Sequence, residues 1–120
     1  MSAKATVAQG PVAPGWIRAF LDLALLAVLT EGERHGYALA QRLAEEGLGN
    51  VTGGVLYPAL GRLEAQGVVT ATWQAGEGGP GRKVYELTPA GRDRLAAERS
   101  QWRDFTGTTN HLLEKTEDKP

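Results

Sequence analysis

The sequence predicts a mainly α-helical fold with one small β-hairpin, and three observations support this prediction. Residues 54–67 carry three leucines at helical spacing, which form one apolar stripe on a helix face. Two β-rich runs follow at 68–73 and 84–87, separated by a glycine-rich turn. Two helical segments precede this region and a long one follows it. This order is that of a winged helix-turn-helix with a C-terminal dimerisation helix.

The composition limits the classes of function that the chain can have. Its 120 residues are enough for one domain. It has no cysteine, which excludes disulfides, thiolate metal sites and cysteine nucleophiles, and its two histidines lack metal-ligand spacing. We therefore expect no metal and no cofactor. We also expect no enzymatic activity, because no pair of carboxylates has a recognisable catalytic placement.

The net charge of −1 argues against a nucleic-acid binder, because such domains are usually basic. Charges are screened from one another beyond roughly 8–10 Å at physiological salt, however. A small DNA-binding face therefore needs only local cations, and Arg82 and Lys83 in the glycine-rich turn supply them.

The first fifteen residues are rich in alanine, glycine and proline, and we interpret residues 1–15 as a disordered arm. The arm lacks the continuous apolar stretch of a signal peptide. The apolar run at 16–29 is too short to span a membrane and contains Arg18 and Asp22. We therefore expect a cytoplasmic protein with no membrane partner.

Two helices are predicted before the leucine stripe. Residues 16–30 form a helix that is apolar on nearly all sides, so we expect its own core to cover one side and a second subunit the other. A second helix is predicted at 37–46. The turn between them, at 31–36, contains His35, which we expect to support the turn before Tyr37.

The third helix has a signal at each end. Thr52 is predicted as its N-cap, with the side chain accepting a hydrogen bond from the first turn. Pro58 lies past the first turn if the helix begins near Gly53, so we expect an irregular or kinked start. Gly67 is expected to end the helix in a left-handed conformation.

The last helix is predicted at 90–115, with Thr88 as its N-cap and Pro89 at its first position. Residues 106–110 are poor helix formers, so we expect the helix to bend or fray there. The winged helix-turn-helix domain then spans 16–89, and a polar tail occupies 116–120. Apolar residues at seven- and three-residue steps form a short coiled-coil-like seam on the last helix: Leu95, Trp102, Phe105 and Leu112.

Three stretches of the chain carry recognisable motifs: Leu23-Ala24-Leu25-Leu26 with His35-Gly36-Tyr37; Gly54-Val55-Leu56-Tyr57-Pro58-Ala59-Leu60 with Arg62-Leu63-Glu64 and Gly67; and Arg82-Lys83-Val84-Tyr85-Glu86-Leu87-Thr88 with Gly91. In these motifs the chain resembles the PadR family of bacterial winged-helix transcriptional regulators. The resemblance implies a homodimer joined by a single C-terminal helix. In multidrug-sensing members, a tryptophan of each dimer helix sandwiches flat aromatic ligands, and Trp102 stands at the matching place. The chain departs from those members at Thr106, where they have an acid.

Eight residues are candidates for contacts with DNA. The start of the third helix offers N–H groups to a phosphate, and its glycines allow close approach of the backbone. The outward side of that helix, the start of the second helix and the wing supply the remaining candidates. The full set is Tyr37, Thr52, Gly53, Gly54, Tyr57, Arg62, Arg82 and Lys83.

Each of these candidates has a structural alternative. Tyr57 and Arg62 are also explained as solvent-facing residues of a packed helix, and Tyr37 as a half-buried core aromatic. The threonine and glycines at 52–54 are also explained as a capping turn. Arg82 and Lys83 are also explained as a solvated turn.

Four residues are candidates for a ligand site at the dimer centre: Trp102, Phe105, Leu95 and Trp16. The alternative for Trp102 is a dimer core residue without a ligand. The glycines at 76–81 match a GxGxxG pattern, but they lead into a strand instead of a helix. A wing tip therefore explains them better than a dinucleotide site.

These observations favour a DNA-binding transcriptional regulator. The main hypothesis is a homodimeric repressor that binds a pseudo-palindromic operator in double-stranded DNA and is released by a small planar aromatic effector. Two alternatives remain open at this point. One is a small-molecule sensor or carrier that does not bind DNA, and the other is a winged-helix module that contacts proteins.

Overall fold

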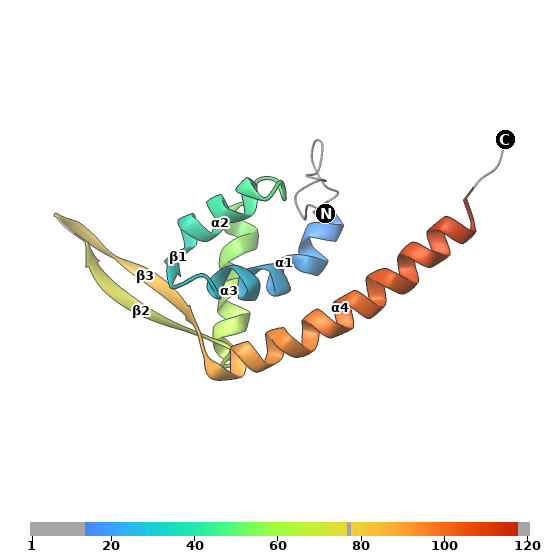
Figure 1. Ribbon diagram of the computed structural model, residues 1–120. Coiled ribbons are helices and arrows are strands. Elements are labelled where there is room, and N and C mark those ends of the chain that lie inside the picture. Colours follow the sequence, from blue (N-terminus) through green and yellow to red (C-terminus); the bar gives the residue numbers. More distant parts are fainter. Residues whose placement is uncertain (1–13, 77, 118–120) are drawn as a thin grey trace.

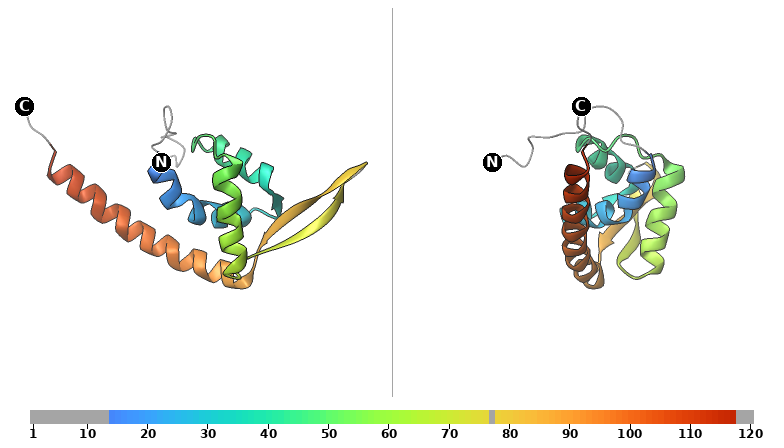
Figure 2. Two further views of the ribbon diagram at one scale, coloured as in Figure 1. Left: turned by 180° about the vertical axis from the view of Figure 1, so that it is seen from behind. Right: turned by 90° about the vertical axis from the view of Figure 1, so that its right-hand side faces the viewer.

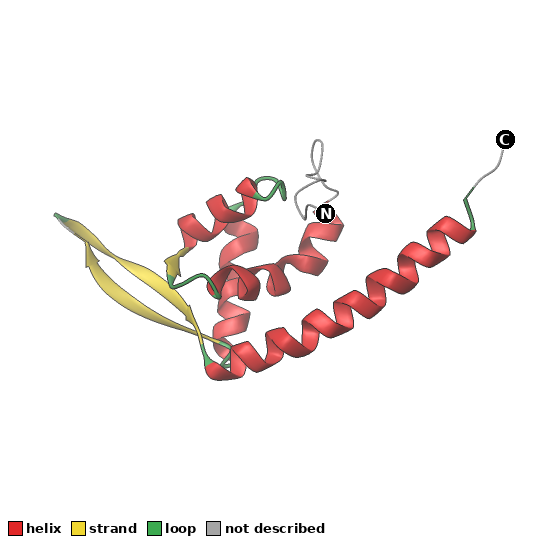
Figure 3. Ribbon diagram, in the orientation of Figure 1, coloured by secondary structure: helices red, strands yellow, loops and turns green. Residues whose placement is uncertain are grey.

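The computed structural model describes residues 14–76 and 78–117, and it shows four helices and a three-stranded antiparallel sheet (Figures 1 and 3). The strand order in the sheet is β1-β3-β2. This architecture confirms the predicted winged helix-turn-helix with a C-terminal helix. The elements are α1 (Pro14–Leu29), β1 (Arg34–His35), α2 (Gly36–Glu45), α3 (Gly53–Ala65), β2 (Val69–Gly76), β3 (Gly79–Leu87) and α4 (Pro89–Lys115).

The predicted arm and tail lie mostly outside the described residues, which begin at Pro14 and end at residue 117. Pro14 and Gly15, which the sequence placed in the arm, are the first residues of α1. Of the predicted tail, only residues 116 and 117 are described.

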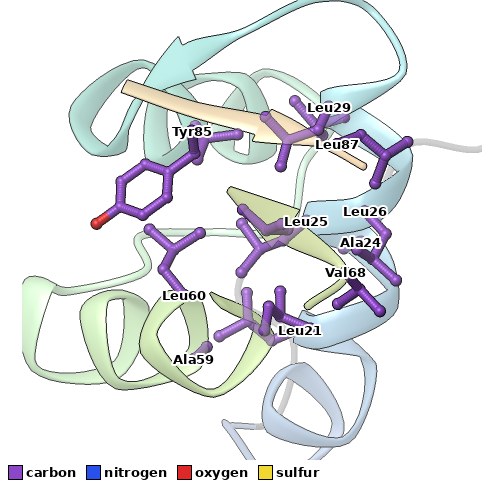
Figure 4. Close-up of a cluster of buried hydrophobic side chains, with 14 of the residues drawn as sticks. Leu21, Ala24, Leu25, Leu26, Leu29, Ala59, Leu60, Val68, Tyr85 and Leu87 are labelled. Atoms are coloured by element: carbon purple, nitrogen blue, oxygen red, sulfur yellow. The ribbon is translucent and has the colours of Figure 1, made fainter. Parts of the chain in front are cut away.

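Helix α1 is central to the fold, because it contacts each of the other three helices. The predicted burial of this helix holds for its C-terminal half, where Leu25 and Leu26 have no exposed surface. Its N-terminal end differs, since the Trp16 side chain is 74% exposed. Figure 4 shows the α1 leucines packed on side chains of α3 and β3. The core cluster comprises Leu21, Ala24, Leu25, Leu26, Val28, Leu29, Leu39, Leu43, Leu56, Ala59, Leu60, Leu63, Val68, Val69, Tyr85, Leu87 and Leu95.

The end of α3 follows the predicted capping geometry. Gly67 has φ +75°, its N–H donates to Glu64 O at 3.0 Å, and the N–H of Val68 donates to Leu63 O at 3.2 Å. These are the two hydrogen bonds of a Schellman motif, which requires a left-handed residue that glycine adopts without strain. The chain therefore leaves α3 sharply and enters the wing.

The start of α3 differs in detail from the prediction. Thr52 is the N-cap in position, but within the described part of the chain its side chain makes no capping hydrogen bond. Its carbonyl oxygen accepts instead, from the N–H groups of Val55 and Leu56 at 3.0 and 2.8 Å. The helix continues as one element through Pro58, so the expected irregular start does not interrupt it.

The wing is longer than the sequence indicated. Strands β2 and β3 pair in antiparallel register from Val69 opposite Leu87 to Gly76 opposite Gly79, with an irregularity between Gln74 and Gly76.

Strand β1 was not predicted from the sequence, which indicated a turn at its two residues. Arg34 pairs with Tyr85 and His35 with Val84. Two residues are too few to show a strand period, so only the tertiary pairing reveals them.

Helix α4 runs unbroken from Pro89 to Lys115, so the expected fraying at 106–110 is wrong. The hydroxyls of Thr106 and Thr109 donate back to the carbonyls of Trp102 and Phe105, at 2.9 and 2.7 Å, and are thereby satisfied within the helix. Figures 1 and 2 show that the wing and the C-terminal half of α4 project from the helical core in opposite directions.

The start of α4 is fixed against the end of α3. As predicted, the Thr88 hydroxyl caps α4 by accepting from the Gly91 N–H at 3.0 Å, and it donates to Gly67 O at 2.8 Å. Gly91 packs directly on the Val68 carbonyl. A Cβ at Gly91 would overlap that oxygen and lie 2.7 Å from Leu87 Cδ1. Because the obstacle is backbone, no side-chain rotation relieves it.

We predict that Gly91→Ala destabilises the fold by about 2–3 kcal/mol, the usual cost of overpacking a buried site. Gly107→Ala is the matched control in the same helix, because a Cβ there meets nothing within 4 Å. It should stabilise the protein by about 0.5–1 kcal/mol, the helix propensity gain of alanine over glycine. Thermal unfolding followed by circular dichroism measures both changes, and equal midpoints for the two variants would contradict the packing argument.

Candidate nucleic-acid interface

An open groove of about 680 Å³ lies between the helices α2 and α3 and the wing. It brings together four of the eight predicted DNA contacts, which come from three different elements. All four are polar groups or aromatic rings at the surface, so the groove presents a mixed cationic and aromatic face. Its lining is His35, Gly36, Tyr37, Tyr57, Gly61, Glu64, Trp73, Arg82, Lys83 and Tyr85.

The two predicted tyrosines both reach the surface of this groove. Tyr37 at the start of α2 is 65% exposed, which rules out the alternative that it is a half-buried core aromatic. Its ring lies parallel to that of His35, with 6.5 Å between the ring centroids. Tyr57 on α3 is 50% exposed. Both side chains therefore present exposed surface to a ligand in the groove.

Lys83 is held at the groove by two neighbours. Its Nζ lies 3.3 Å from Glu64 Oε1 on α3 and 5.8 Å from the centroid of the Tyr85 ring. Burial raises the pKa of the Tyr85 hydroxyl, so this group stays neutral beneath the ammonium. The Lys83–Glu64 pair is about 40% exposed on both sides and contributes little to stability.

Arg82 has a weaker partner. Its Nη1 lies 3.2 Å from His35 Nε2, while His35 Nδ1 faces the Ala38 N–H at 3.4 Å and caps α2. The predicted support was for the turn before Tyr37, whereas the His35 side chain contacts the backbone one residue after Tyr37. A neutral imidazole accepts a hydrogen bond at only one ring nitrogen. Here the Ala38 N–H faces one nitrogen and Arg82 faces the other, so His35 cannot accept from both. Arg82 is exposed and makes no ion pair with any of the described residues, so an incoming anion can recruit it.

The N-terminus of α3 lies at the surface. Thr52, Gly53 and Gly54 are all exposed, and the hydrogen bonds of the first turn begin only at the N–H of Val55. A Cβ at Gly54 would have only Thr52 Oγ1 within reach, at 4.0 Å. The backbone N–H groups of the two glycines are therefore open to a phosphate, as is typical of a helix N-terminus.

Arg62 lies away from the groove that contains the other candidates. Its Nη2 donates to Asp22 Oδ1 of α1 at 3.1 Å, with the Arg62 side chain 55% exposed. Gly61, one residue earlier on α3, lines the first groove. The structure thus directs Arg62 toward α1 and α4.

Arg62 belongs to a second, smaller groove of about 380 Å³, between α1, α3 and α4. Two predicted ligand residues, Trp102 and Phe105, line it. The Trp102 ring lies 5.1 Å from the ring of Phe20 and 5.9 Å from that of Phe105, centroid to centroid. The full lining is Arg18, Ala19, Asp22, Leu23, Arg62, Arg94, Glu98, Gln101, Trp102 and Phe105.

The other two ligand candidates lie elsewhere. Leu95 is 2% exposed and belongs to the hydrophobic core, because the first turns of α4 pack on the domain itself. Trp16 is exposed at the start of α1 and is not among the residues that line this groove.

Six residues that line the first groove were not predicted as DNA contacts: His35, Gly36, Gly61, Glu64, Trp73 and Tyr85. Trp73 is 73% exposed and lies opposite Lys83 in the strand pair, so an apolar ring flanks the cation. Glu64 was interpreted only as part of a motif, and Gly36 likewise. For Trp73 a signal was present, because a large aromatic on a short wing strand has no core to enter.

Among the residues that the structure describes, no group of three or more histidine, aspartate and glutamate side chains is placed to hold a metal ion. The described helices also include none that is both long and apolar enough to cross a membrane.

A helix that lines a groove beside a cationic hairpin is the arrangement of a winged helix-turn-helix DNA-binding domain. Comparisons with known proteins identify the family within this class. The family model described as "Transcriptional regulator PadR-like family" matches residues 25–97. The chain belongs to the PadR-like family of transcriptional regulators, and this membership implies DNA binding.

Individual relatives agree with this assignment. Transcriptional regulator Rv3488 of Mycobacterium tuberculosis is 40% identical over 82 residues, which cover 68% of this chain and 75% of the relative. The crystal structure of a PadR family transcriptional regulator from Eggerthella lenta is 34% identical, with a TM-score of 0.76, and covers 83% of this chain and 87% of its own. The crystal structure of a PadR-like transcriptional regulator from Bacillus cereus is 28% identical, with a TM-score of 0.73. The match covers 88% of this chain and 99% of the Bacillus cereus chain.

Proposed function

We propose that the protein is a homodimeric transcriptional repressor that reads a pseudo-palindromic operator with α3 and clamps the adjacent backbone with its wing. The observation that carries this proposal is the groove between α3 and the wing. It gathers Tyr37, Tyr57, Arg82 and Lys83 from three elements onto one face. In this arrangement α3 enters the major groove, and the wing cations approach phosphates beside it.

The local charge supports this role although the chain as a whole carries −1. Among the described residues that line the groove, two are cationic, Arg82 and Lys83, and one is a carboxylate, Glu64. The open N–H groups of Gly53 and Gly54 at the start of α3 add a partial positive charge close to this face. The electrostatic match to a phosphate backbone is therefore local, as short-range screening permits.

The exposed apolar side chains of α4 support a dimer. Beyond Leu95, the large hydrophobic side chains of this helix are exposed within the described chain, although Trp102 is partly covered by Phe20. A contiguous apolar surface of this kind is rarely left open in a stable monomer. Pairing two copies through α4 places two α3 helices on one side of a duplex, with half-sites about 34–36 Å apart. The exposed set is Trp102, Phe105, Leu112 and Leu113, at 38, 61, 56 and 63%.

The second groove supports regulation by a small planar aromatic effector. Trp102 supplies an aromatic face there, and Arg62 of α3 lines the same groove, where its hydrogen bond with Asp22 links α3 to α1. A ligand that displaces the Arg62 guanidinium alters the anchoring of α3 on α1. Such a ligand releases DNA only if it prefers the form of the dimer that does not fit the operator. The site of action of such a repressor is the bacterial cytoplasm.

The wing cations give the first test of the proposal. With a fluorescent fragment of the protein's own promoter, the double variant Arg82→Ala, Lys83→Ala should bind more weakly. Its dependence of log affinity on log salt should be shallower by about 0.9 for each phosphate that the wing no longer neutralises. Glu64→Gln is the opposite-sign control, since it removes the carboxylate that holds Lys83. The Glu64→Gln variant should bind DNA several-fold more tightly, because it removes one carboxylate that repels the phosphates, a repulsion of about 1 kcal/mol. Unchanged affinity and slope in both variants would count against the wing contact.

The effector proposal is tested by tryptophan fluorescence with acridine as a planar probe. Acridine should quench the unsubstituted protein, and Trp102→Ala should weaken its binding at least about tenfold, the scale of an aromatic stacking interaction worth about 1.4 kcal/mol. Trp73→Phe is the matched control, because Trp73 is an exposed tryptophan outside the second groove. Binding that survives Trp102→Ala would exclude this site. If the protein binds acridine but has no affinity for DNA at any salt concentration, a small-molecule sensor or carrier is favoured.

A further inference from the structure

Gly36, the first residue of α2, lies directly beneath the ring of Tyr57 on α3. Gly36 is buried, although Tyr57 above it is half exposed. A Cβ at position 36 would lie 2.6 Å from both Cε1 and Oη of Tyr57 and 2.8 Å from Cζ. Carbon atoms that are not bonded to one another do not approach so closely, so the tyrosine ring occupies the space that any side chain at position 36 needs.

A second glycine borders the same ring. A Cβ at Gly53 would lie 3.5 Å from Tyr57 Cδ2 and 3.6 Å from Cε2, which is ordinary van der Waals contact. The two glycines come from the starts of α2 and α3. The tip of the ring therefore rests on α2, while its other edge passes close to the start of α3.

The backbone does not require glycine at position 36. Positive φ values occur at Gly32, Gly47, Gly49, Gly67 and Gly78, and Gly36 is not among these residues. Alanine also forms helices more readily than glycine. Within α2 itself, a glycine at this position has a cost and no conformational purpose. The close approach of Tyr57 is the feature of the structure that accounts for it.

We propose that Gly36 is a positioning residue for DNA recognition: it lets the Tyr57 ring settle on α2, so that the hydroxyl is held at a fixed place in the groove. This inference rests on the proposed function and adds to it a residue that itself contacts no base or phosphate. With a methyl group at position 36, the Tyr57 ring must swing away. Because the ring is the exposed end of a side chain, the domain tolerates the movement, and the loss falls on DNA binding.

The test is a double-mutant cycle with Gly36→Ala, Tyr57→Ala and the variant that carries both. Each protein is titrated against a fluorescent promoter fragment, and its unfolding midpoint is measured. Gly36→Ala should bind DNA about tenfold more weakly, the scale of one side-chain interaction with DNA. In the Tyr57→Ala background the same change should have no further effect, because the ring that it displaces is absent. Gly107→Ala, a change with open space around it on α4, should bind like the unsubstituted protein.

The unfolding midpoint separates positioning from damage to the fold. Gly36→Ala should leave the midpoint equal or higher. If it lowers the midpoint, the variant that carries both changes should recover the midpoint of Tyr57→Ala, which again identifies the ring as the obstacle. An equal loss of DNA affinity in both backgrounds would overturn the inference, since the effect would not pass through Tyr57.

Failure of the inference is distinguishable from failure of the proposed function. If Tyr57→Ala weakens binding but Gly36→Ala binds normally, Gly36 has no positioning role and the DNA-binding surface stands. If the unsubstituted protein does not bind its promoter fragment at any salt concentration, the proposed function fails, and the positioning role fails with it.

Discussion

The rest of the structure depends on the junction where α3 ends and α4 begins. Thr88 makes four hydrogen bonds there: its N–H donates to Val68 O at 3.2 Å, its hydroxyl donates to Gly67 O, the same oxygen accepts from the Gly91 N–H, and its carbonyl oxygen accepts from the Arg92 N–H at 2.9 Å. Gly91 packs on the Val68 carbonyl with no room for a Cβ. The last residues of α3, both strands of the wing and the first turn of α4 are thereby fixed to one another. A change of angle between α4 and the wing must strain this junction.

Helix α3 separates two grooves of this small domain, and the junction fixes α3 relative to both the wing and α4. The groove with Tyr57 and Lys83 lies on one side of α3, and the groove with Trp102 lies on the other. Gly61 and Arg62 are adjacent in sequence but face different grooves. In the proposed function, an event at Trp102 reaches α3 by two short routes, the Arg62–Asp22 hydrogen bond and the rigid α3–α4 junction. Neither route requires a long chain of contacts.

Local signals in the sequence predicted most of the fold. The leucine stripe, Gly67 and the Thr88-Pro89 pair act within a few residues, and each is found where the pattern placed it. Features that depend on tertiary contact were not predictable in this way. The direction of Arg62 depends on Asp22, forty residues earlier, and the burial of Leu95 depends on where α4 docks. The role of Gly36 depends on a ring from another helix. Poor helix propensity at 106–110 did not break α4, and the hydroxyls of Thr106 and Thr109 are satisfied by carbonyls of the preceding turn.

In the proposed function, two chains joined through α4 present two copies of α3 to one duplex. Sedimentation velocity with a fluorescent promoter fragment measures this directly, because it gives the mass of the protein alone and the number of chains on the DNA. At micromolar concentration the account predicts a particle of twice the chain mass, and a complex of two chains per duplex. A single chain in solution, and one chain per duplex with the cognate fragment present, would contradict it.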